Sequence, residues 1–253
     1  MAFGNADSYA RFMGRFSEPL APAFADLLDV PEDGRVLDVG CGPGVLTSVL
    51  VARYGAERVS AIDPAPGFVE AARDRLPGVD LREGSAESLP YEDGAFDATY
   101  AQLVVHFMAD AHAGVREMSR VTRPGARIAA CVWDHGGGRG PLSPFWSAVA
   151  ELDPDGVSEP STGSNRGDLE RLFDETGLVD VEGGELSVTV TMPTFEDWWA
   201  PYLERTGSAG DYLVGRPPEQ VDELRELCRT RLGDGPFDVV GWTWTATGRV
   251  PTH

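Results

Sequence analysis

The chain of 253 residues contains 41 acidic and 21 basic residues, which give it a formal net charge of −20 at pH 7. This charge disfavours nucleic acid and anionic membrane surfaces as partners, because both attract basic patches. No apolar run approaches the length of a membrane span, and the first residues lack the basic start and apolar middle of a signal peptide. We therefore expect a single cytoplasmic domain over residues 1–253, a monomer or homodimer that binds neither membranes nor nucleic acid.

The cysteines and histidines give no sign of a metal site. Cys41, Cys131 and Cys228 lie far apart and form no C-x-x-C pair, so we expect reduced thiols. The four histidines are not spaced as metal ligands are, and we predict that the protein holds no metal.

The first elements are a helical leader and a strand that ends in glycines. Apolar residues recur at steps of three or four over residues 7–28, and this predicts a leader helix within residues 1–30 that carries Tyr9 and Arg15. The apolar run 36–39 then leads into Gly40, Gly42 and Gly44, and a stretch with helical periodicity follows. We interpret this as strand, tight turn and helix. The glycines permit positive φ and leave room for a ligand, which the N–H groups at the helix start would face.

Strands and helices then alternate as far as residue 133. We predict strands over 59–64, 80–85, 96–102 and 126–133, with helices over 68–76 and 110–123. Such alternation indicates an α/β fold whose parallel sheet has helices on both faces and binds ligands at the carboxyl ends of its strands. Four side chains fall at such ends: Asp63, Ser85, Gln102 and Trp133.

Asp63 has the strongest claim to a binding role. It follows Gly40 by 23 positions, and in nucleotide-binding βαβ units an acidic residue about 20 positions on holds the ribose hydroxyls. A carboxylate can accept hydrogen bonds from two vicinal hydroxyls, which a backbone group does not offer.

The regular alternation breaks after Trp133. We predict helices over 145–152, 168–175, 195–205 and 218–232, and strands over 186–192 and 238–250. The segments 135–165 and 193–236 are interpreted as caps that fold over the strand ends.

The ordered set of motifs resembles one enzyme family. Val36–Gly44 resembles the glycine-rich motif of class I S-adenosylmethionine-dependent methyltransferases, and Ala61–Pro64 resembles their acidic motif on the second strand. Three further stretches resemble later family motifs, and the likeness is good over 35–133 and weak elsewhere; these stretches are 84–97, 103–107 and 116–125.

The resemblance implies a Rossmann-like three-layer sandwich with a mostly parallel sheet of seven strands, the last antiparallel, and a helical cap. It also implies S-adenosyl-L-methionine as the cofactor and assigns particular residues to each part of it. Gly40 and Gly42 would pass close to the methionine part, and Asp63 in its motif with Pro64 would hold the ribose diol. The remaining implied contacts are Ser85, Ala86 and Glu87 beside adenine, Gln102 near the methionine or sulfonium, and Tyr9 and Arg15 at the carboxylate.

Two of these positions carry alternatives. The family usually has Asp where this chain has Ser85, so the adenine contact is expected to rest on the backbone at Ala86 and the carboxylate of Glu87. Asp38 either contacts the ammonium group of the cofactor or only braces the glycine turn.

Methyl transfer needs a base only when the nucleophile arrives protonated. His106, just past a predicted strand end, is our candidate catalytic base, and a packed or carbonyl-bonded histidine is the alternative. Asp134 and His135 lie in the glycine-rich loop after the strand predicted over 126–133, as surface groups or as substrate contacts. Trp146, Trp198 and Trp199 would suit the wall of an apolar or aromatic substrate pocket, whereas Trp242 and Trp244 are expected in the core.

We predict methyl transfer to a small-molecule acceptor through an O, N or C nucleophile. An NAD-dependent oxidoreductase is the first alternative, but the third glycine of G-x-G-x-x-G is replaced by Val45, and the chain has no lysine for a Tyr-x-x-x-Lys pair. A non-catalytic protein that holds the cofactor or a nucleoside is the second. Methylation of nucleic-acid bases is disfavoured by the charge and by the lack of an Asn/Asp-Pro-Pro-aromatic motif after the fourth strand.

Overall fold

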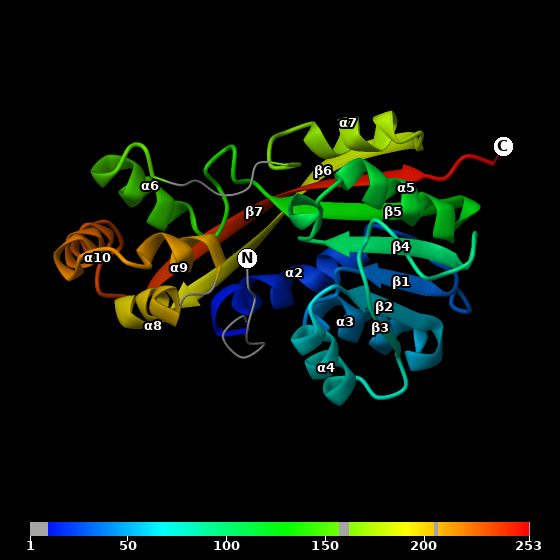
Figure 1. Cartoon of the computed structure of the whole chain (residues 1–253), viewed down its shortest axis with the longest axis horizontal. Helices are drawn as coiled ribbons and strands as arrows, with labels where there is room; N and C mark the ends of the chain where they lie inside the picture. Colours follow the sequence, from blue (N-terminus) through cyan, green and yellow to red (C-terminus); the bar gives the residue numbers. More distant parts are fainter. Residues whose placement is uncertain (1–9, 157–161, 205–206, 253) are drawn as a thin grey trace.

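The computed structural model describes residues 10–156, 162–204 and 207–252 (Figure 1). Tyr9, one of the predicted cofactor contacts, lies outside the described residues. Among the described residues, no helix combines the length and the apolar character that crossing a bilayer requires.

A seven-stranded sheet forms the centre of the fold, with the strand order β3-β2-β1-β4-β5-β7-β6. The first five strands pair in parallel, and β7 pairs antiparallel with both β5 and β6. The predicted α/β sheet with an antiparallel last strand is therefore confirmed. The strands are β1 (Val36–Val39), β2 (Val59–Asp63), β3 (Asp80–Glu83), β4 (Phe96–Gln102), β5 (Thr122–Trp133), β6 (Val179–Met192) and β7 (Phe237–Arg249).

Helices cover both faces of this sheet. Side chains of α2 and α3 share one core cluster with alternate residues of β1, β4 and β5, and side chains of α5 and α7 share a second cluster with the intervening residues. A smaller cluster joins α4 to β2 and β3. The helices are α2 (Arg15–Ala25), α3 (Val45–Tyr54), α4 (Pro66–Arg75), α5 (Ala111–Val121), α6 (Ser143–Leu152), α7 (Asp168–Glu175), α8 (Phe195–Trp199), α9 (Gly207–Leu213) and α10 (Pro218–Leu232).

Local chemistry accounts for the limits of several helices. The carboxylate of Asp110 accepts a hydrogen bond of 2.9 Å from the Ala113 N–H at the start of α5, and the hydroxyl of Thr194 accepts one of 3.1 Å from the Asp197 N–H at the start of α8. Both are N-caps that satisfy otherwise unpaired donors. Gly233, with a φ of 82°, follows the last residue of α10.

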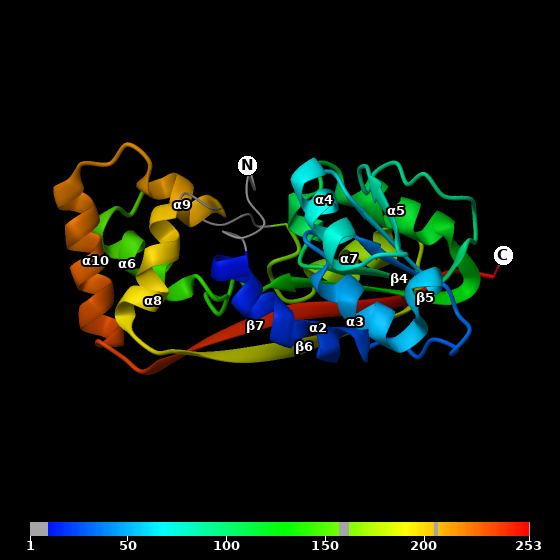
Figure 2. The same cartoon turned by 90° about the horizontal axis from the view of Figure 1, so that it is seen from below.

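Four helices and one 3-10 helix gather at one end of the long antiparallel pair of β6 and β7, away from α3, α4 and α5 (Figures 1 and 2). We call α6, α8, α9, α10 and η4 (Ala200–Glu204) the helical group. Its members come from the two segments expected to cap the strand ends, and a role over a bound acceptor stays a prediction. The leader helix α2 lies between this group and the rest of the sheet, packed against α3 and β6.

Several predicted boundaries were wrong. Strand β6 begins at Val179 and not at 186, because Val179 and residues 182–185 pair with β7 although the side chains of this stretch do not alternate. The helix predicted over 110–123 ends at Val121, since Thr122 already pairs with Phe96 in the sheet. The predicted leader helix is a π-helical turn over Ala10–Gly14 followed by α2, and the helix predicted over 195–205 is divided into α8 and η4.

Candidate functional site

The glycine turn after β1 is shaped by three residues with positive φ, which are 71° at Gly40, 54° at Gly42 and 87° at Gly44. A Cβ at Gly40 would lie 2.2 Å from Cγ2 of Val104, so this glycine is required for packing. A Cβ at Gly42 would meet no atom within 4 Å. The middle of the turn therefore faces open space, as a turn that lies against a ligand must.

Asp63, the last residue of β2, is hydrogen-bonded to this turn. Its Oδ2 accepts a bond of 2.9 Å from the Gly42 N–H, and its Oδ1 accepts one of 2.9 Å from the Ala65 N–H. Burial raises the pKa of Asp63, and these two bonds oppose that rise. Each carboxylate oxygen has a second lone pair, so the group can still accept bonds from a diol. Pro64 follows it directly and is exposed.

Asp38 lies on β1, beneath the turn, and is fully buried. Its Oδ2 accepts a hydrogen bond of 2.6 Å from the hydroxyl of Thr47 on α3. Burial, with a smaller contribution from the charge of Asp63, raises the pKa of Asp38 to about 7. The bond to Thr47 ties β1 to the helix after the turn, which is what the bracing alternative requires.

A cavity of about 30 Å³ lies against the glycine turn, with room for one or two water molecules. A nucleoside must therefore extend beyond this space or displace its walls. The side-chain amide of Gln102 donates a bond of 3.3 Å to the Ser17 carbonyl, and its buried Oε1 has no partner. The lining residues are Ser17, Asp38, Gly40, Cys41, Gly42, Pro43, Val45, Leu46, Gln102 and Leu103.

Sequence reasoning missed Ser17, Thr47 and Leu103 as parts of this site. Leu103 has a φ of 61°, a strained conformation for a residue with a side chain, and its N–H donates to the Cys131 carbonyl at 2.9 Å. Ser17 sits on the leader helix, two residues after Arg15. The helical pattern of the leader could have suggested a cavity-facing residue there, whereas the backbone of Leu103 left no signal in the sequence.

The loop after β3 carries the residues expected beside adenine. The Ser85 hydroxyl donates to the Glu87 carboxylate, which also accepts bonds of 2.8 Å and 3.3 Å from the N–H groups of Ala109 and Asp110. Burial alone would raise the pKa of Glu87, but these bonds outweigh it and lower that pKa. The carboxylate thus joins the loop to the start of α5. The adenine contacts of Ser85, Ala86 and Glu87 stay predictions.

The guanidinium of Arg15 points to the helical group. Its Nη1 donates to the Asp197 carbonyl at 2.9 Å and lies 3.1 Å from Sδ of Met192. Burial lowers the pKa of Arg15. A contact with the carboxylate of a cofactor would need this side chain to leave both partners, and it stays a prediction.

His106 lies in the 3-10 helix η3 (Val105–Phe107), just after β4, and only 9% of its surface is exposed. Its ring centroid is 3.9 Å from that of Phe107 and 5.7 Å from that of His135, and its Nδ1 has no hydrogen-bond partner. Burial, and then the charge of His135, lowers the pKa of His106 to about 3. The imidazole is therefore neutral at neutral pH and is a weak proton acceptor before an acceptor binds.

The other polar and aromatic candidates have structural partners. Asp134 is buried and accepts from the Gly137 N–H at 2.7 Å and from the Arg139 guanidinium, so it anchors its loop. Trp198 and Trp199 are buried in an aromatic cluster of the helical group, whereas Trp146 is half-buried beside Phe145. Within the described ranges, no three His, Cys, Asp or Glu residues are grouped as metal ligands.

Comparisons with known proteins agree with this geometry. Residues 37–130 match the family model described as a methyltransferase domain. Trans-aconitate 2-methyltransferase of Methylobacterium nodulans is 32% identical over 135 residues, which cover 53% of this chain and 52% of that protein. The chain thus spans about half the length of such curated relatives. An uncharacterized protein of Mycobacterium bovis is 28% identical over 251 residues, with 93% of this chain and 88% of that protein covered.

The fold is shared with solved methyltransferases. Phosphoethanolamine N-methyltransferase 2 of Haemonchus contortus, solved with S-adenosyl-L-methionine, matches with a TM-score of 0.57 and 17% identity over 92% of this chain and 52% of that one. The NAD-dependent oxidoreductase alternative gains no support from these matches. Residues 37–130 of this chain thus match a methyltransferase domain, and the chain as a whole shares the fold of solved methyltransferases.

Proposed function

We propose that the protein binds S-adenosyl-L-methionine at the glycine turn and transfers its methyl group to a small-molecule acceptor. One observation carries the proposal: the Gly42 N–H and the Asp63 carboxylate are joined at 2.9 Å beside a position where a Cβ would meet no atom. A bare backbone and an acid at the carboxyl edge of a parallel sheet together suit an adenosyl group.

The residues present fit two parts of the cofactor, its ribose and its ammonium group. Asp63 keeps free lone pairs for the ribose hydroxyls, and the buried Oε1 of Gln102 lacks the donor that an ammonium group would supply. The buried carboxyl group of Asp38 lines the same cavity, and an ammonium group beside it would favour its ionised form against the burial that raises its pKa. When bound, the sulfonium supplies a methyl carbon that is already activated for displacement.

The chain itself then has to position the acceptor and exclude water. The neutral ring of His106, in η3 four residues after β4 ends at Gln102, is the group we assign to an acceptor that arrives protonated. Its unpartnered Nδ1 could take the proton of a hydroxyl or an acidic C–H once the acceptor has displaced solvent. An acceptor that arrives deprotonated would need no such step.

Binding of the cofactor product is the first test. S-adenosylhomocysteine should raise the melting temperature, because a ligand of the native state stabilises it by mass action, and NAD should not. A shift with NAD and none with S-adenosylhomocysteine would overturn the proposal. Transfer of a labelled methyl group to members of an acceptor panel would then separate an enzyme from a non-catalytic binding protein.

A further inference from the structure

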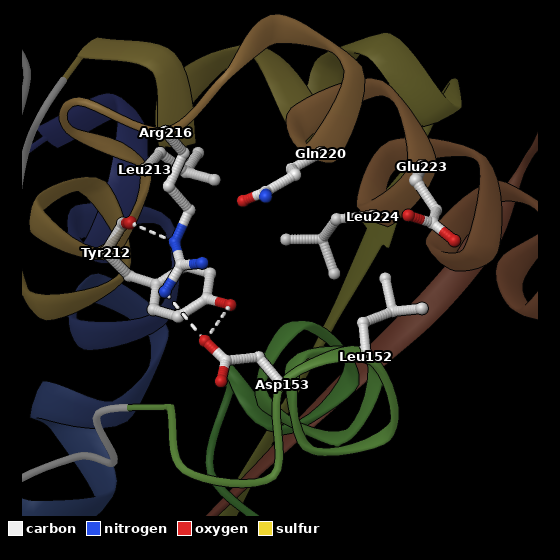
Figure 3. Close-up of a pocket in the computed structure, with 8 residues that line it drawn as sticks. All are labelled: Leu152, Asp153, Tyr212, Leu213, Arg216, Gln220, Glu223 and Leu224. Atoms are coloured by element: carbon white, nitrogen blue, oxygen red, sulfur yellow. Dashed lines mark hydrogen bonds and ion pairs between the residues drawn. The ribbon is translucent and has the colours of Figure 1, made fainter.

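A second cavity, of about 300 Å³, opens within the helical group. It shares no lining residue with the cavity at the glycine turn. Figure 3 shows its walls, which come from the end of α6, from α9 and the loop after it, and from the first turns of α10. Its size is at the lower end of the range for small-molecule sites in proteins. The lining residues are Leu152, Asp153, Tyr212, Leu213, Arg216, Gln220, Glu223 and Leu224.

The guanidinium of Arg216, which lines this cavity, is already paired with the carboxylate of Asp153. Nη2 of Arg216 donates to Oδ2 of Asp153 at 2.7 Å, and the Tyr212 hydroxyl donates to the same oxygen at 3.0 Å. Nε of Arg216 donates to the Tyr212 carbonyl at 2.9 Å, and its guanidinium carbon lies 3.7 Å from the centre of the Tyr212 ring (Figure 3). These contacts fix the guanidinium against one wall and use the charge that an anionic ligand would need.

The opposite wall carries an acid and apolar surface. Gln220 and Glu223 stand on α10, with Leu224 directly after Glu223 in the chain, and Leu152 at the end of α6 faces them across the opening (Figure 3). Asp153 and Glu223 give two negative charges against the one positive charge of Arg216. The carboxyl end of α6 adds partial negative charge on the side of the cavity formed by Leu152 and Asp153, because its last carbonyls lack helical partners.

We propose that this cavity is a second binding site, for a small organic cation that has an apolar body. An ammonium group would lie against Glu223 and Gln220, and its hydrocarbon part would contact Leu152, Leu213 and Leu224. The net charge of −20 would draw such a cation toward the protein at low ionic strength. The site needs no cofactor, so its failure and the failure of the proposed methyl transfer are separate results.

The test compares three probes of equal chain length, namely hexylammonium, hexanol and hexanoate, by NMR titration of the full chain at low salt. We expect saturable binding in the order hexylammonium, hexanol, hexanoate. Glu223→Gln should weaken hexylammonium binding by about two- to fivefold, as expected for an exposed ion pair. Glu219→Gln, the same change at an exposed position of α10 that does not line the cavity, should leave binding unchanged.

Arg216→Gln gives the sharpest contrast, because it changes the charge of the site without removing a proposed contact. A cation site predicts that hexylammonium binds at least as tightly to this variant, whereas an anion site predicts loss of hexanoate binding. Circular dichroism would check that the variant folds, and Leu152→Ser, at a half-exposed position, supplies a second variant that should weaken all apolar probes. Tighter binding of hexanoate, no saturable binding of hexylammonium, or equal effects of Glu223→Gln and Glu219→Gln would each overturn the proposal.

Discussion

The backbone nitrogen of Gly42 lies 2.9 Å from Oδ2 of Asp63, although 21 positions separate the two residues. Parallel pairing brings them together, because Val39 at the end of β1 is in register with Ile62, the residue before Asp63. The N–H groups of Gly40 and Cys41 both donate to the Ile62 carbonyl, at 2.8 Å and 3.0 Å, and so hold the turn against the end of β2. The site is therefore a product of sheet register.

Replacing the acid should separate binding from folding. Asp63→Asn keeps an acceptor for the backbone N–H groups but loses the charge, so we expect S-adenosylhomocysteine to bind about tenfold or more weakly while the fold persists. Isothermal titration gives the dissociation constant. Asp26→Asn, which removes an exposed acid paired with Arg53, is the matched control and should leave binding unchanged. An unchanged dissociation constant in Asp63→Asn would exclude its carboxylate from the cofactor site.

A methyl group added to the turn should block the ligand. Gly42 and Gly177 both have positive φ, 54° and 89°, and at both positions a Cβ would meet nothing within 4 Å. We expect Gly42→Ala and Gly177→Ala to lower the free energy of unfolding by similar amounts, about 1 kcal/mol, because both alanines are strained. Only Gly42→Ala should abolish the thermal shift with S-adenosylhomocysteine. An equal shift in both variants would mean that Gly42 does not face the cofactor.

The buried acid beneath the turn should make stability depend on pH. The pKa of Asp38 rises from 3.8 to about 7 on folding, so the native state keeps a proton that the unfolded state has released between these values. Its contribution to stability is full below pH 3.8 and is lost as the pH rises to about 7. In Asp38→Asn this contribution disappears, and the difference in free energy of unfolding, variant minus wild type, should increase across that window. Urea titrations at several pH values measure it, and a constant difference would contradict the burial of the charge.

His106 should make stability depend on pH in the opposite direction from Asp38. Its pKa falls from 6.5 to about 3 on folding, so between these pH values the unfolded state binds a proton that the native state does not bind. Its contribution to stability is present above pH 6.5 and is lost as the pH falls toward 3. His106→Gln removes this acid sensitivity, whereas His112→Gln, at an exposed position beside Glu175, serves as the control. If His106 is the base, His106→Gln should also slow turnover by about a hundredfold. Normal turnover with intact cofactor binding would exclude that role.

The motifs near the glycine turn were predictable because each depends on local backbone geometry. A strand, three glycines and an acid at the next strand end specify how two neighbouring parallel strands meet, and the structure places Gly42 and Asp63 accordingly. The helices 168–175 and 218–232 were predicted with the observed limits, since their apolar spacing and their flanking glycines are encoded locally.

The features that escaped prediction depend on distant partners. Residues 182–185 read Glu-Gly-Gly-Glu, which has no strand pattern, and they extend only because β7 lies beside them. The guanidinium of Arg15 bonds to the Asp197 carbonyl, 182 positions away, so its orientation could not be inferred from the leader alone. Helix α9 contains two glycines and is supported by its packing on η4.

The antiparallel pair of β6 and β7 extends beyond the rest of the sheet. Strand β5 ends at Trp133, opposite Thr243, so residues 237–241 of β7 pair with β6 alone. A ribbon of two strands resists twisting less than a sheet in which each strand is held on both sides. The helical group lies at the end of this two-stranded extension. Exchanging its helices for others would leave the register of the five parallel strands unchanged. The helical group can therefore change while the contact between Gly42 and Asp63, which the pairing of β1 with β2 sets, stays as it is.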